Sequence, residues 1–530
     1  MKKILTLFAV MLVVLTASAQ TLNITVGNVT YQYPASQTGD MTFSGGNTVT
    51  IMGKAFKLND VNSIIVDNTE VTDGTVGVVY EGTSAKVFVA GNIAQYITPS
   101  IRGAHVSIDQ SSSLEEEVTY TLSGSSSDGE FYATGYYKAT VELNGLTLTN
   151  SSPVYSGAAV CIQNGKRIKV KVVTGTTNTL ADAANGSQKG CLYIKGHAEF
   201  AQKGTLNVKG NVKHAIKTGE YFSIKNATIN VTSSVGDGIS CNEYFLMESG
   251  TINISGVEDD GIQCEIDGES STGETTDHED EDSGNIYISG GSINVACTTA
   301  SANGIKSDGD ITISDGTINV SSTGNKGEGI ESEGYVKITG GHVTVNSYDD
   351  AINAGQDITI SGGYVFARST NNDGIDANGD CYIKGGVVYA IGGVEPEVAI
   401  DANTEGGYKL YVQGGTIIAF GSLESGTSFS QGNVSASFTR GSNYALYDGN
   451  TLLMAFKAPS SGSTSVMNLS HPTLKSGTSY TLKSGVTLTG GTSYFDGYYF
   501  DNPTVSGGYS TSLKASSSSG SGGGWGPGGR

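Results

Sequence analysis

The sequence predicts an all-β protein built around a parallel β-helix, and three observations lead to this fold class. An isoleucine, usually preceded by an acidic residue and by Gly or Ala, recurs at intervals of about 23 residues through the middle of the chain. Each interval contains three short segments in which apolar and polar residues alternate, which is the pattern of strands. Glycine supplies 75 of the 530 residues, and charged residues make up only 15%. Such a composition favours short strands joined by tight turns.

The first residues have the features of a secretory signal. A basic start is followed by an apolar run over residues 4–15 and by the small residues at 17–19. This order is typical of a signal peptide, so we expect residues 1–19 to be removed before Gln20. No later apolar run reaches the roughly 18 residues that a membrane span needs. We therefore expect an exported protein, in the periplasm, at the cell surface or outside the cell, with no membrane span.

Four further regions follow in order. Residues 20–135 contain strand-like runs without the repeat and are expected to form a small β-rich N-terminal domain. Residues 136–420 carry the repeat and are expected to form the β-helix. Residues 421–512 have strand and turn signals, and we expect them to cap the end of the β-helix, whose sheet edges would otherwise be exposed. Residues 513–530 are rich in Gly and Ser and predict a disordered tail.

The repeat is anchored by eight isoleucines, Ile216, Ile239, Ile262, Ile305, Ile330, Ile352, Ile375 and Ile400. One interval is long because it contains the acidic segment 267–282, and removing about 18 to 20 residues restores the period. This segment lacks the third acid and the final glutamate of an EF-hand, so we expect a loop inserted into one coil. A period of about 23 residues fits a coil of three strands, whereas a β-propeller blade needs about 40 residues.

Charge and cysteine content exclude several classes of function. The chain has 51 acidic and 30 basic residues, a net charge of −21. Without basic clusters, nucleic acid is not an expected partner. The same charge repels acidic polysaccharides unless cations intervene. The six cysteines fit neither a zinc site nor a redox motif, so we expect structural thiols or disulfides, and for Cys241 and Cys264, in consecutive coils, both remain open.

The register places acidic residues in two columns, one two residues before the anchoring isoleucine and one directly after it. Carboxylates stacked about 5 Å apart repel by about 1 to 3 kcal/mol per pair, so water, protonation or a hard cation must compensate. Any single Asp-Gly is also a common turn. For the columns together we predict calcium, with these candidate ligands: Asp237, Asp260, Glu328, Glu331, Asp349, Asp350, Asp373, Asp376 and Asp401.

Two other outward ladders follow from the same register. Asparagines recur at Asn207, Asn230, Asn253, Asn294 and Asn319, and we expect their amides to bond to one another along the axis. Later coils carry Tyr364, Phe366, Arg368 and Tyr389 on the outward side. These residues are candidates for stacking on sugar rings. We favour the alternative that the C-terminal region packs over them, because outward apolar ladders rarely stay bare.

The chain resembles a known family in the run from "GSQKGCLYIKG" to "VGDGIS" (186–240), in "DDGIQC" and in "NGIKSDGDITISDGTINV". These segments are similar to the bacterial secreted carbohydrate-binding β-helix family, related in shape to pectate lyases, over about residues 140–420. The resemblance implies a right-handed parallel β-helix that binds acidic or plant-type polysaccharide with calcium and has no assured catalytic activity.

The residues themselves give little support to catalysis. The nucleophile elbow and the HExxH zinc motif are both absent from the sequence. A lyase would need a basic residue beside calcium, and Arg368 and several lysines have no identifiable partner. We therefore expect a monomeric, non-catalytic polysaccharide-binding protein. The alternatives are a calcium-dependent polysaccharide lyase and a structural or adhesive surface protein.

Overall fold

The computed structural model describes residues 20–39, 41–266, 281–393 and 396–518, and it confirms the all-β prediction. The described part contains strands and three short 3-10 segments but no α-helix, and no helix in it is long and apolar enough to cross a bilayer. The chain divides into two compact units, one ending at Asn242 and one beginning at Glu243. The predicted signal peptide, nearly all of the acidic insertion and most of the predicted tail lie outside the described residues.

The first unit begins with a small β structure. Strand β1 (Thr21–Val26) pairs antiparallel with β2 (Val29–Pro34) and with β6 (Val61–Asp67). Strands β3 (Thr42–Ser44), β4 (Thr48–Ile51) and β5 (Lys54–Lys57) form a separate antiparallel sheet. Strand β7 (Thr75–Glu81) pairs antiparallel with β8 (Ser84–Ala90) and parallel with β11 (Val118–Ser126), the first long strand of the coils.

Parallel coils occupy the rest of the first unit. One sheet is formed by β10 (Ala104–Gln110), β12 (Gly129–Thr134), β14 (Val160–Gln163), β17 (Gly190–Ile194), β20 (His214–Thr218) and β23 (Ile239–Asn242), with β9 (Ile97–Arg102) antiparallel at its edge. The other coil strands are β11 (Val118–Ser126), β13 (Ala139–Thr149), β15 (Ile168–Val172), β16 (Thr177–Ala181), β18 (Ala198–Ala201), β19 (Thr205–Gly210), β21 (Phe222–Ile224) and β22 (Thr228–Ser234). In the first of these sheets, parallel stacking begins at Ala104, before residue 136, where the β-helix was predicted to start.

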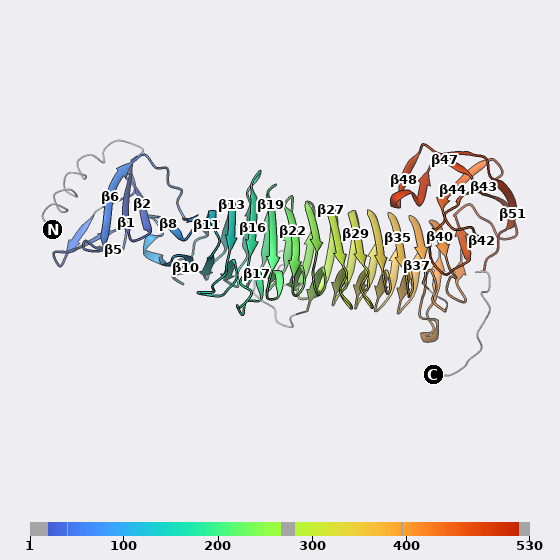
Figure 1. Ribbon diagram of the computed structural model, residues 1–530, viewed down its shortest axis with the longest axis horizontal. Coiled ribbons are helices and arrows are strands. Elements are labelled where there is room, and N and C mark those ends of the chain that lie inside the picture. The colour runs from blue at the N-terminus through green and yellow to red at the C-terminus, as the bar shows by residue number, and fades with distance from the viewer. Residues whose placement is uncertain (1–19, 40, 267–280, 394–395, 519–530) are drawn as a thin grey trace. The chain divides into compact units, whose positions relative to one another are not determined.

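The second unit repeats this arrangement as a parallel β-solenoid (Figure 1). The sheet that carries the anchoring isoleucines consists of β26 (Ile262–Glu265), β28 (Ile305–Ser307), β30 (Ile330–Ser332), β33 (Ile352–Ala354) and β36 (Ile375–Ala377). The remaining coil strands are β24 (Tyr244–Met247), β25 (Thr251–Ser255), β27 (Asn285–Cys297), β29 (Ile311–Ser322), β31 (Val336–Ile338), β32 (His342–Ser347), β34 (Ile358–Ile360), β35 (Tyr364–Ser369), β37 (Cys381–Ile383), β38 (Val387–Ile391), β39 (Leu410–Val412) and β40 (Thr416–Phe420).

The isoleucine ladder has the predicted register in this unit. Ile262 pairs with Ile305 although the acidic insertion separates them in sequence, so the coil register continues from one side of the insertion to the other. Ile305, Ile330, Ile352 and Ile375 continue the ladder, and all are buried. At a corner, Gly363 has a φ of 78°, and a Cβ there would lie 2.7 Å from the carbonyl carbon of Gly340 in the preceding coil. The corner therefore requires glycine for both conformation and space.

The outward amide ladder is confirmed within each unit. In the first unit, the Asn230 amide donates to the Asn207 side-chain oxygen at 2.8 Å. In the second, Asn294 donates to Asn253 and Asn319 donates to Asn294, both at 2.9 Å. All six cysteines are buried as thiols, which answers the question left open for Cys241 and Cys264.

The C-terminal region of the second unit consists of antiparallel sheets. Strand β45 (Val466–Ser470) pairs with β40 and with β42 (Asn433–Ser437). A six-stranded sheet contains β43 (Asn443–Asp448), β44 (Thr451–Lys457), β46 (Ser479–Ser484), β48 (Thr492–Tyr494), β49 (Tyr499–Asp501) and β51 (Tyr509–Lys514). The short strands β41 (Ser428–Phe429), β47 (Thr487–Thr489) and β50 (Thr504–Ser506) complete the region. Because Ala515 is buried and Ser516 bridges to Asn433, ordered structure extends past the boundary predicted at residue 512.

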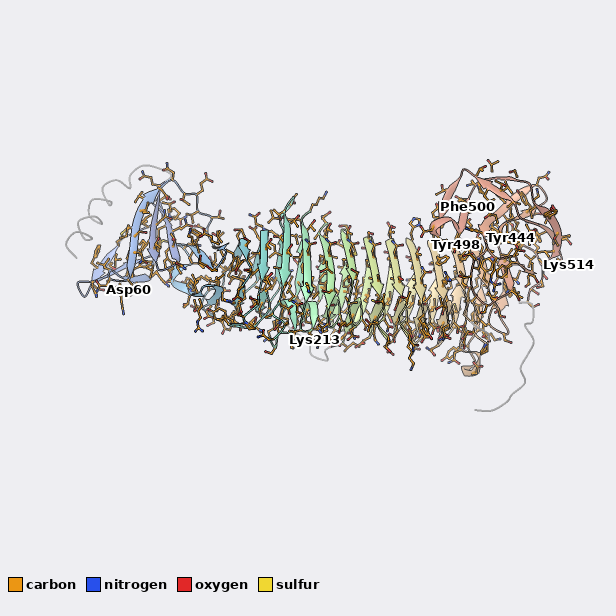
Figure 2. The ribbon with its side chains drawn as sticks, in the orientation of Figure 1. Asp60, Lys213, Tyr444, Tyr498, Phe500 and Lys514 are labelled. Atoms are coloured by element: carbon orange, nitrogen blue, oxygen red, sulfur yellow. The ribbon has the colours of Figure 1, made fainter. Side chains whose placement is uncertain are left out.

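The outward aromatic residues of the late coils lie beneath this region. Phe366 and Tyr389 are 3% and 0% exposed. Their rings contact the ring of Tyr498, with centroids 5.5 and 5.7 Å away, and Tyr498 belongs to the C-terminal region (Figure 2). They are therefore not available to stack on sugar rings, which corrects that prediction in favour of its alternative. An outward apolar ladder has been covered by a second apolar surface.

Candidate functional site

The acidic columns of the second unit meet at one face of the sheet formed by β30, β33 and β36. Strand pairing places Glu331 opposite Asn353, and Asn353 opposite Asp376. Because the isoleucines before them point into the core, these side chains point outward from three consecutive coils. The pairing confirms the predicted register of this column.

The second column lies at the corner before each of these strands. Its members use one side-chain oxygen to accept the backbone N–H of the equivalent residue in the next coil. The pairs are Asn303 N–H to Asp260 (2.7 Å), Glu328 N–H to Asn303 (2.8 Å), Asp373 N–H to Asp350 (2.8 Å) and Val398 N–H to Asp373 (2.5 Å). These bonds join neighbouring coils and are not local turn caps, and they occupy one oxygen each of Asp260, Asp350 and Asp373.

Three carboxylates from the two columns converge. One oxygen each from Asp350, Asp373 and Asp376 lies within 4.8 Å of the other two. Asp350 and Asp373 are only 4% and 6% exposed. Asp350 belongs to one coil, and Asp373 and Asp376 belong to the next. The second oxygen of Asp350 accepts a hydrogen bond from the Asn372 amide at 3.1 Å.

Burial and mutual repulsion disfavour the ionised forms of these acids. Burial, and after it the charge of Asp376, raises the pKa of Asp350 to about 9. Burial likewise raises the pKa of Asp373 to about 7, against the opposing hydrogen bond from the Val398 N–H. The pKa of Asp376 is also raised by burial. At neutral pH the cluster therefore favours either bound protons or a bound cation.

Further acids extend the cluster along the stack. Burial raises the pKa of Glu328 to about 8, with additional repulsion from Glu331 and Asp349. Burial and a hydrogen bond shared with Glu424 raise the pKa of Asp401. Isolated bridges from Ile375 to Ile400 and from Ile400 to Leu423 set Asp376, Asp401 and Glu424 in one line. Glu331 is partly balanced by the Lys306 ammonium, 3.2 Å away.

This donor set fits a hard divalent cation. Calcium takes 6 to 8 oxygen ligands from carboxylates, amide or backbone carbonyls and water. Asp350, Asp373 and Asp376 would supply the carboxylates, and each corner carboxylate keeps an oxygen beyond the one that accepts a backbone N–H. A cation would also favour the ionised forms that burial penalises. Zinc fits less well, because the cluster contains neither the His nor the Cys ligands that zinc prefers.

The other predicted ligands are distributed differently. Asp260 is engaged with the Asn303 N–H, and Asp237 lies in the first unit, where its carboxylate is 3.0 Å from His214 Nδ1. Glu424 was missed by the sequence analysis. The signal for it was available, because Leu423 takes the anchor position about 23 residues after Ile400 and Glu424 follows it directly.

The predicted sugar-contact residues do not form an open surface. Tyr364 stacks with His342 and with Tyr494 of the C-terminal region, with centroids 5.1 and 4.0 Å away. Arg368 donates to the Ser461 hydroxyl at 3.0 Å. Together with the buried Phe366 and Tyr389, these residues hold the C-terminal region against the late coils.

Comparison with known proteins gives the following matches. The sequence matches the model of a family described as carbohydrate-binding domain-containing protein over residues 103–374 and 324–486. A solved structure described as the polysaccharide lyase-like protein from C. thermocellum, in a gadolinium derivative, is 18% identical in sequence. The alignment covers 50% of this chain and 92% of that one, with a TM-score of 0.32. No curated protein matches the sequence.

Proposed function

Because the chain belongs to the family of carbohydrate-binding domain-containing proteins, we propose that it is an exported, non-catalytic protein that binds acidic polysaccharides with the help of calcium. The observation that carries this proposal is the buried cluster of Asp350, Asp373 and Asp376. The family supports binding of carbohydrate in general. The acidic glycan, the calcium and the export are further steps, argued from the charges and from the first residues.

Calcium is the cation that best suits the cluster. The acids are held in fixed positions by backbone N–H groups of neighbouring coils, so the site is assembled by the fold itself. Holding three carboxylates together without a cation costs free energy, since burial disfavours their charge. Calcium binding would offset that cost and would require no rearrangement of the coils.

An acidic glycan follows from the charge of the whole chain. At −21, the protein repels polyanions unless cations lie between them. A calcium ion with 6 to 8 ligand positions can hold protein carboxylates on one side and a uronate carboxylate on the other. We therefore propose uronate-containing polysaccharide as the ligand class, including the plant-type glycans.

The basic residues near the cluster are poorly suited to abstracting a proton. Although burial opposes its charge, the neighbouring Glu331 and other acids raise the pKa of Lys306, so it stays protonated at neutral pH. Arg368 is engaged with Ser461 at the C-terminal region. A lyase needs a neutral base beside the acidified carbon, so we propose binding without cleavage.

The proposal is tested by retention on immobilised polygalacturonate, with calcium and with EDTA, while the absorbance of unsaturated product is followed. We expect calcium to increase retention well above its level in EDTA, and we expect no product. Asp376→Asn should lose most of this calcium-dependent retention. The matched control is Asp357→Asn, because Asp357 accepts the Asp380 N–H at 2.8 Å at another corner of the coil that contains Asp350 and lies outside the cluster.

Two results would contradict the proposal. Equal calcium-dependent retention of both variants would mean that the cluster is not the site. Product formation would identify an enzyme and would direct attention to Lys306.

A further inference from the structure

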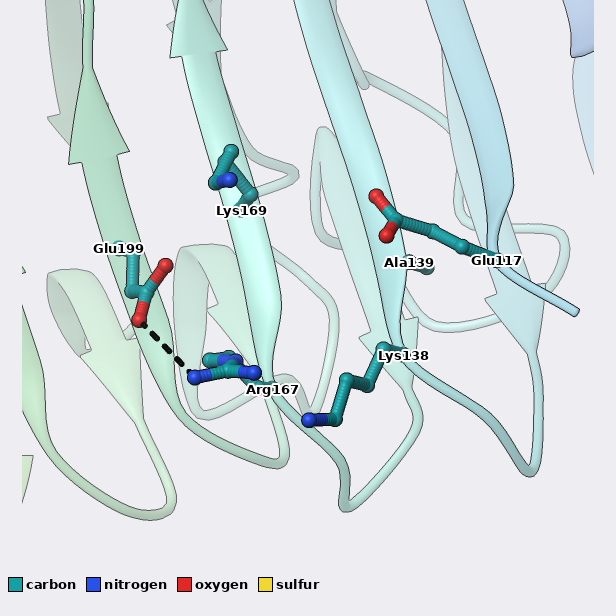
Figure 3. Close-up of a pocket in the computed structure, with 6 residues that line it drawn as sticks. All are labelled: Glu117, Lys138, Ala139, Arg167, Lys169 and Glu199. Carbon is teal, nitrogen blue, oxygen red and sulfur yellow. Dashed lines mark ion pairs between the residues drawn. The ribbon is translucent and has the colours of Figure 1, made fainter. Parts of the chain in front are cut away.

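A second candidate site lies in the first unit, where a pocket of about 180 Å³ opens over the strands β13, β15 and β18. It is lined by Glu117, Lys138, Ala139, Arg167, Lys169 and Glu199. Figure 3 shows the Lys138 side chain extending toward Arg167, whose guanidinium is paired with Glu199 on its other side. Three cationic groups therefore surround one opening, in a chain whose net charge is strongly negative.

The coil register brings these charges together. Ala139 pairs with Ile168, and Ile168 pairs with Ala198, so Lys138 and Arg167 occupy the same corner of consecutive coils. One position further, Thr140 pairs with Lys169, and Lys169 pairs with Glu199. The repeat in this part of the chain is longer than the 23-residue period and has no anchoring Asp-Gly-Ile, so sequence analysis did not align these residues.

The two acids of the pocket already have partners. Glu199 lies 3.8 Å from the Arg167 guanidinium and accepts a hydrogen bond from the Tyr221 hydroxyl at 3.0 Å. Glu117 accepts a hydrogen bond from the Thr140 hydroxyl at 2.6 Å. These contacts hold the acids at the rim, where their remaining oxygens are suited to accept hydrogen bonds from sugar hydroxyls.

Lys169 is exposed, and it makes no ion pair with any residue in the part of the chain that the structure describes, although the Glu117 and Glu199 carboxylates line the same pocket. Lys171 lies two residues after Lys169 on the same face of β15, and its ammonium forms an ion pair with Glu142 at 3.0 Å. The two lysines share strand, face and residue type, but only Lys169 lines the pocket.

We infer that this pocket binds an anionic substituent of a polysaccharide, a carboxylate or a sulfate ester, directly through Lys169, Arg167 and Lys138 and without a metal ion. A guanidinium matches the planar, two-oxygen geometry of such groups, and lysine adds a compact charge. The site differs in chemistry from the acidic cluster, because its charge attracts an anion that the cluster can hold only through calcium. This inference rests on the proposed binding of carbohydrate but not on the proposed calcium.

The test measures binding of the mature full chain to three polymers in EDTA at about 0.15 M ionic strength, where long-range charge effects are screened beyond about 8 Å. The probes are dextran sulfate, polygalacturonate and dextran. We expect binding to one or both anionic polymers and none to dextran, and the comparison of the two tells a sulfate ester from a carboxylate. Lys169→Gln should weaken this binding by about tenfold, the effect of losing one hydrogen bond to a charged group.

The matched control is Lys171→Gln, which removes the same charge from the same strand and should change the affinity by less than about twofold. Equal losses in both variants, or binding to dextran as tight as to dextran sulfate, would overturn the inference, as would the absence of any binding in EDTA. Asp376→Asn separates the two sites, because it should leave binding in EDTA unchanged and remove only the calcium-dependent part.

Discussion

At the scale of the residue, the corner aspartates of the second unit have two roles. One oxygen of Asp350 accepts the Asp373 N–H of the next coil, which fixes the corner. The same carboxylate belongs to the cluster, in which one oxygen each from Asp350, Asp373 and Asp376 lies within 4.8 Å of the other two. An asparagine would keep the first role and lose the second, and Asn303 has the first role in the same column, where its side-chain oxygen accepts the Glu328 N–H.

Asp376 belongs to the other column and has only the second role, so Asp376→Asn should have opposite effects with and without calcium. In EDTA at pH 8, removing one charge from the cluster should stabilise the fold by about 1 kcal/mol, the order of the repulsion between two carboxylates at moderate effective dielectric. With calcium, the variant should lose the stabilisation that the bound ion gives the native protein. Denaturant unfolding in both conditions measures this difference. A variant that is less stable in EDTA, or one that calcium still stabilises fully, would contradict the assignment.

The residues of the cluster were predictable because a fixed period assigns each one to a column. Asp350, Asp373 and Asp376 were all expected there, and their convergence within 4.8 Å follows from coil stacking. What the period could not show is burial, which decides that Asp350 and Asp373 have raised pKa values. The same period places His214 directly before Asp237 in one column, and the structure puts the Asp237 carboxylate 3.0 Å from His214 Nδ1.

At the scale of the element, the amide ladder on β25, β27 and β29 ties neighbouring strands together outside their backbone pairing. Asn294 donates to Asn253 and accepts from Asn319, so it takes part in two bonds of 2.9 Å. Asn319 takes part in one of them. The ladder lies on an outward face, and its bonds compete with bonds to water, which limits the contribution of each.

We expect Asn294→Ala to cost about 1 to 2 kcal/mol of unfolding free energy and Asn319→Ala about half of that, since each bond contributes about 1 kcal/mol. Urea unfolding of the two variants, with thermal midpoints as a second measure, checks the ratio. Equal costs would mean that the bonds are not what stabilises this face, because the two residues share type and ladder position but differ in the number of bonds.

The aromatic elements show where a periodic pattern stops being informative. The sequence correctly places Phe366 and Tyr389 on the outward side of neighbouring strands, and the structure pairs them in register. Alternation tells which side of a strand faces away from the solenoid core, but not what covers that side. The covering residues, such as Tyr498, lie more than 100 positions later in a region without repeats. Only the folded chain connects them.

At the scale of the whole molecule, the acidic cluster links stability to pH and to calcium. The pKa values of Asp373, Glu328 and Asp350 are about 7, 8 and 9, whereas the same groups titrate near 4 in an unfolded chain. Between these limits the folded protein binds more protons than the unfolded one. The contribution of these three acids to the free energy of unfolding is therefore fully present at low pH, and it is lost as the pH rises through their pKa values in the folded protein.

We thus expect the thermal midpoint in EDTA to fall between about pH 5 and pH 9, and calcium to reverse this fall, because it favours the ionised acids. Differential scanning calorimetry across this range, with magnesium as the control ion, measures both effects. A midpoint in EDTA that stays flat over the range would show that the acids are not held in a protonated state, and an equal effect of magnesium would point to general screening of charge.

The position of the cluster between two coils has one more consequence. In a linear array of repeats, cooperativity depends on how strongly each repeat is coupled to its neighbours, and less on how stable each repeat is alone. Asp350 comes from one coil and Asp373 and Asp376 from the next, so a bound cation would strengthen the coupling between them and not either coil by itself. A bound calcium ion would then join two neighbouring coils. It would suppress the separate fraying of the late coils and make this part of the second unit unfold in a single step.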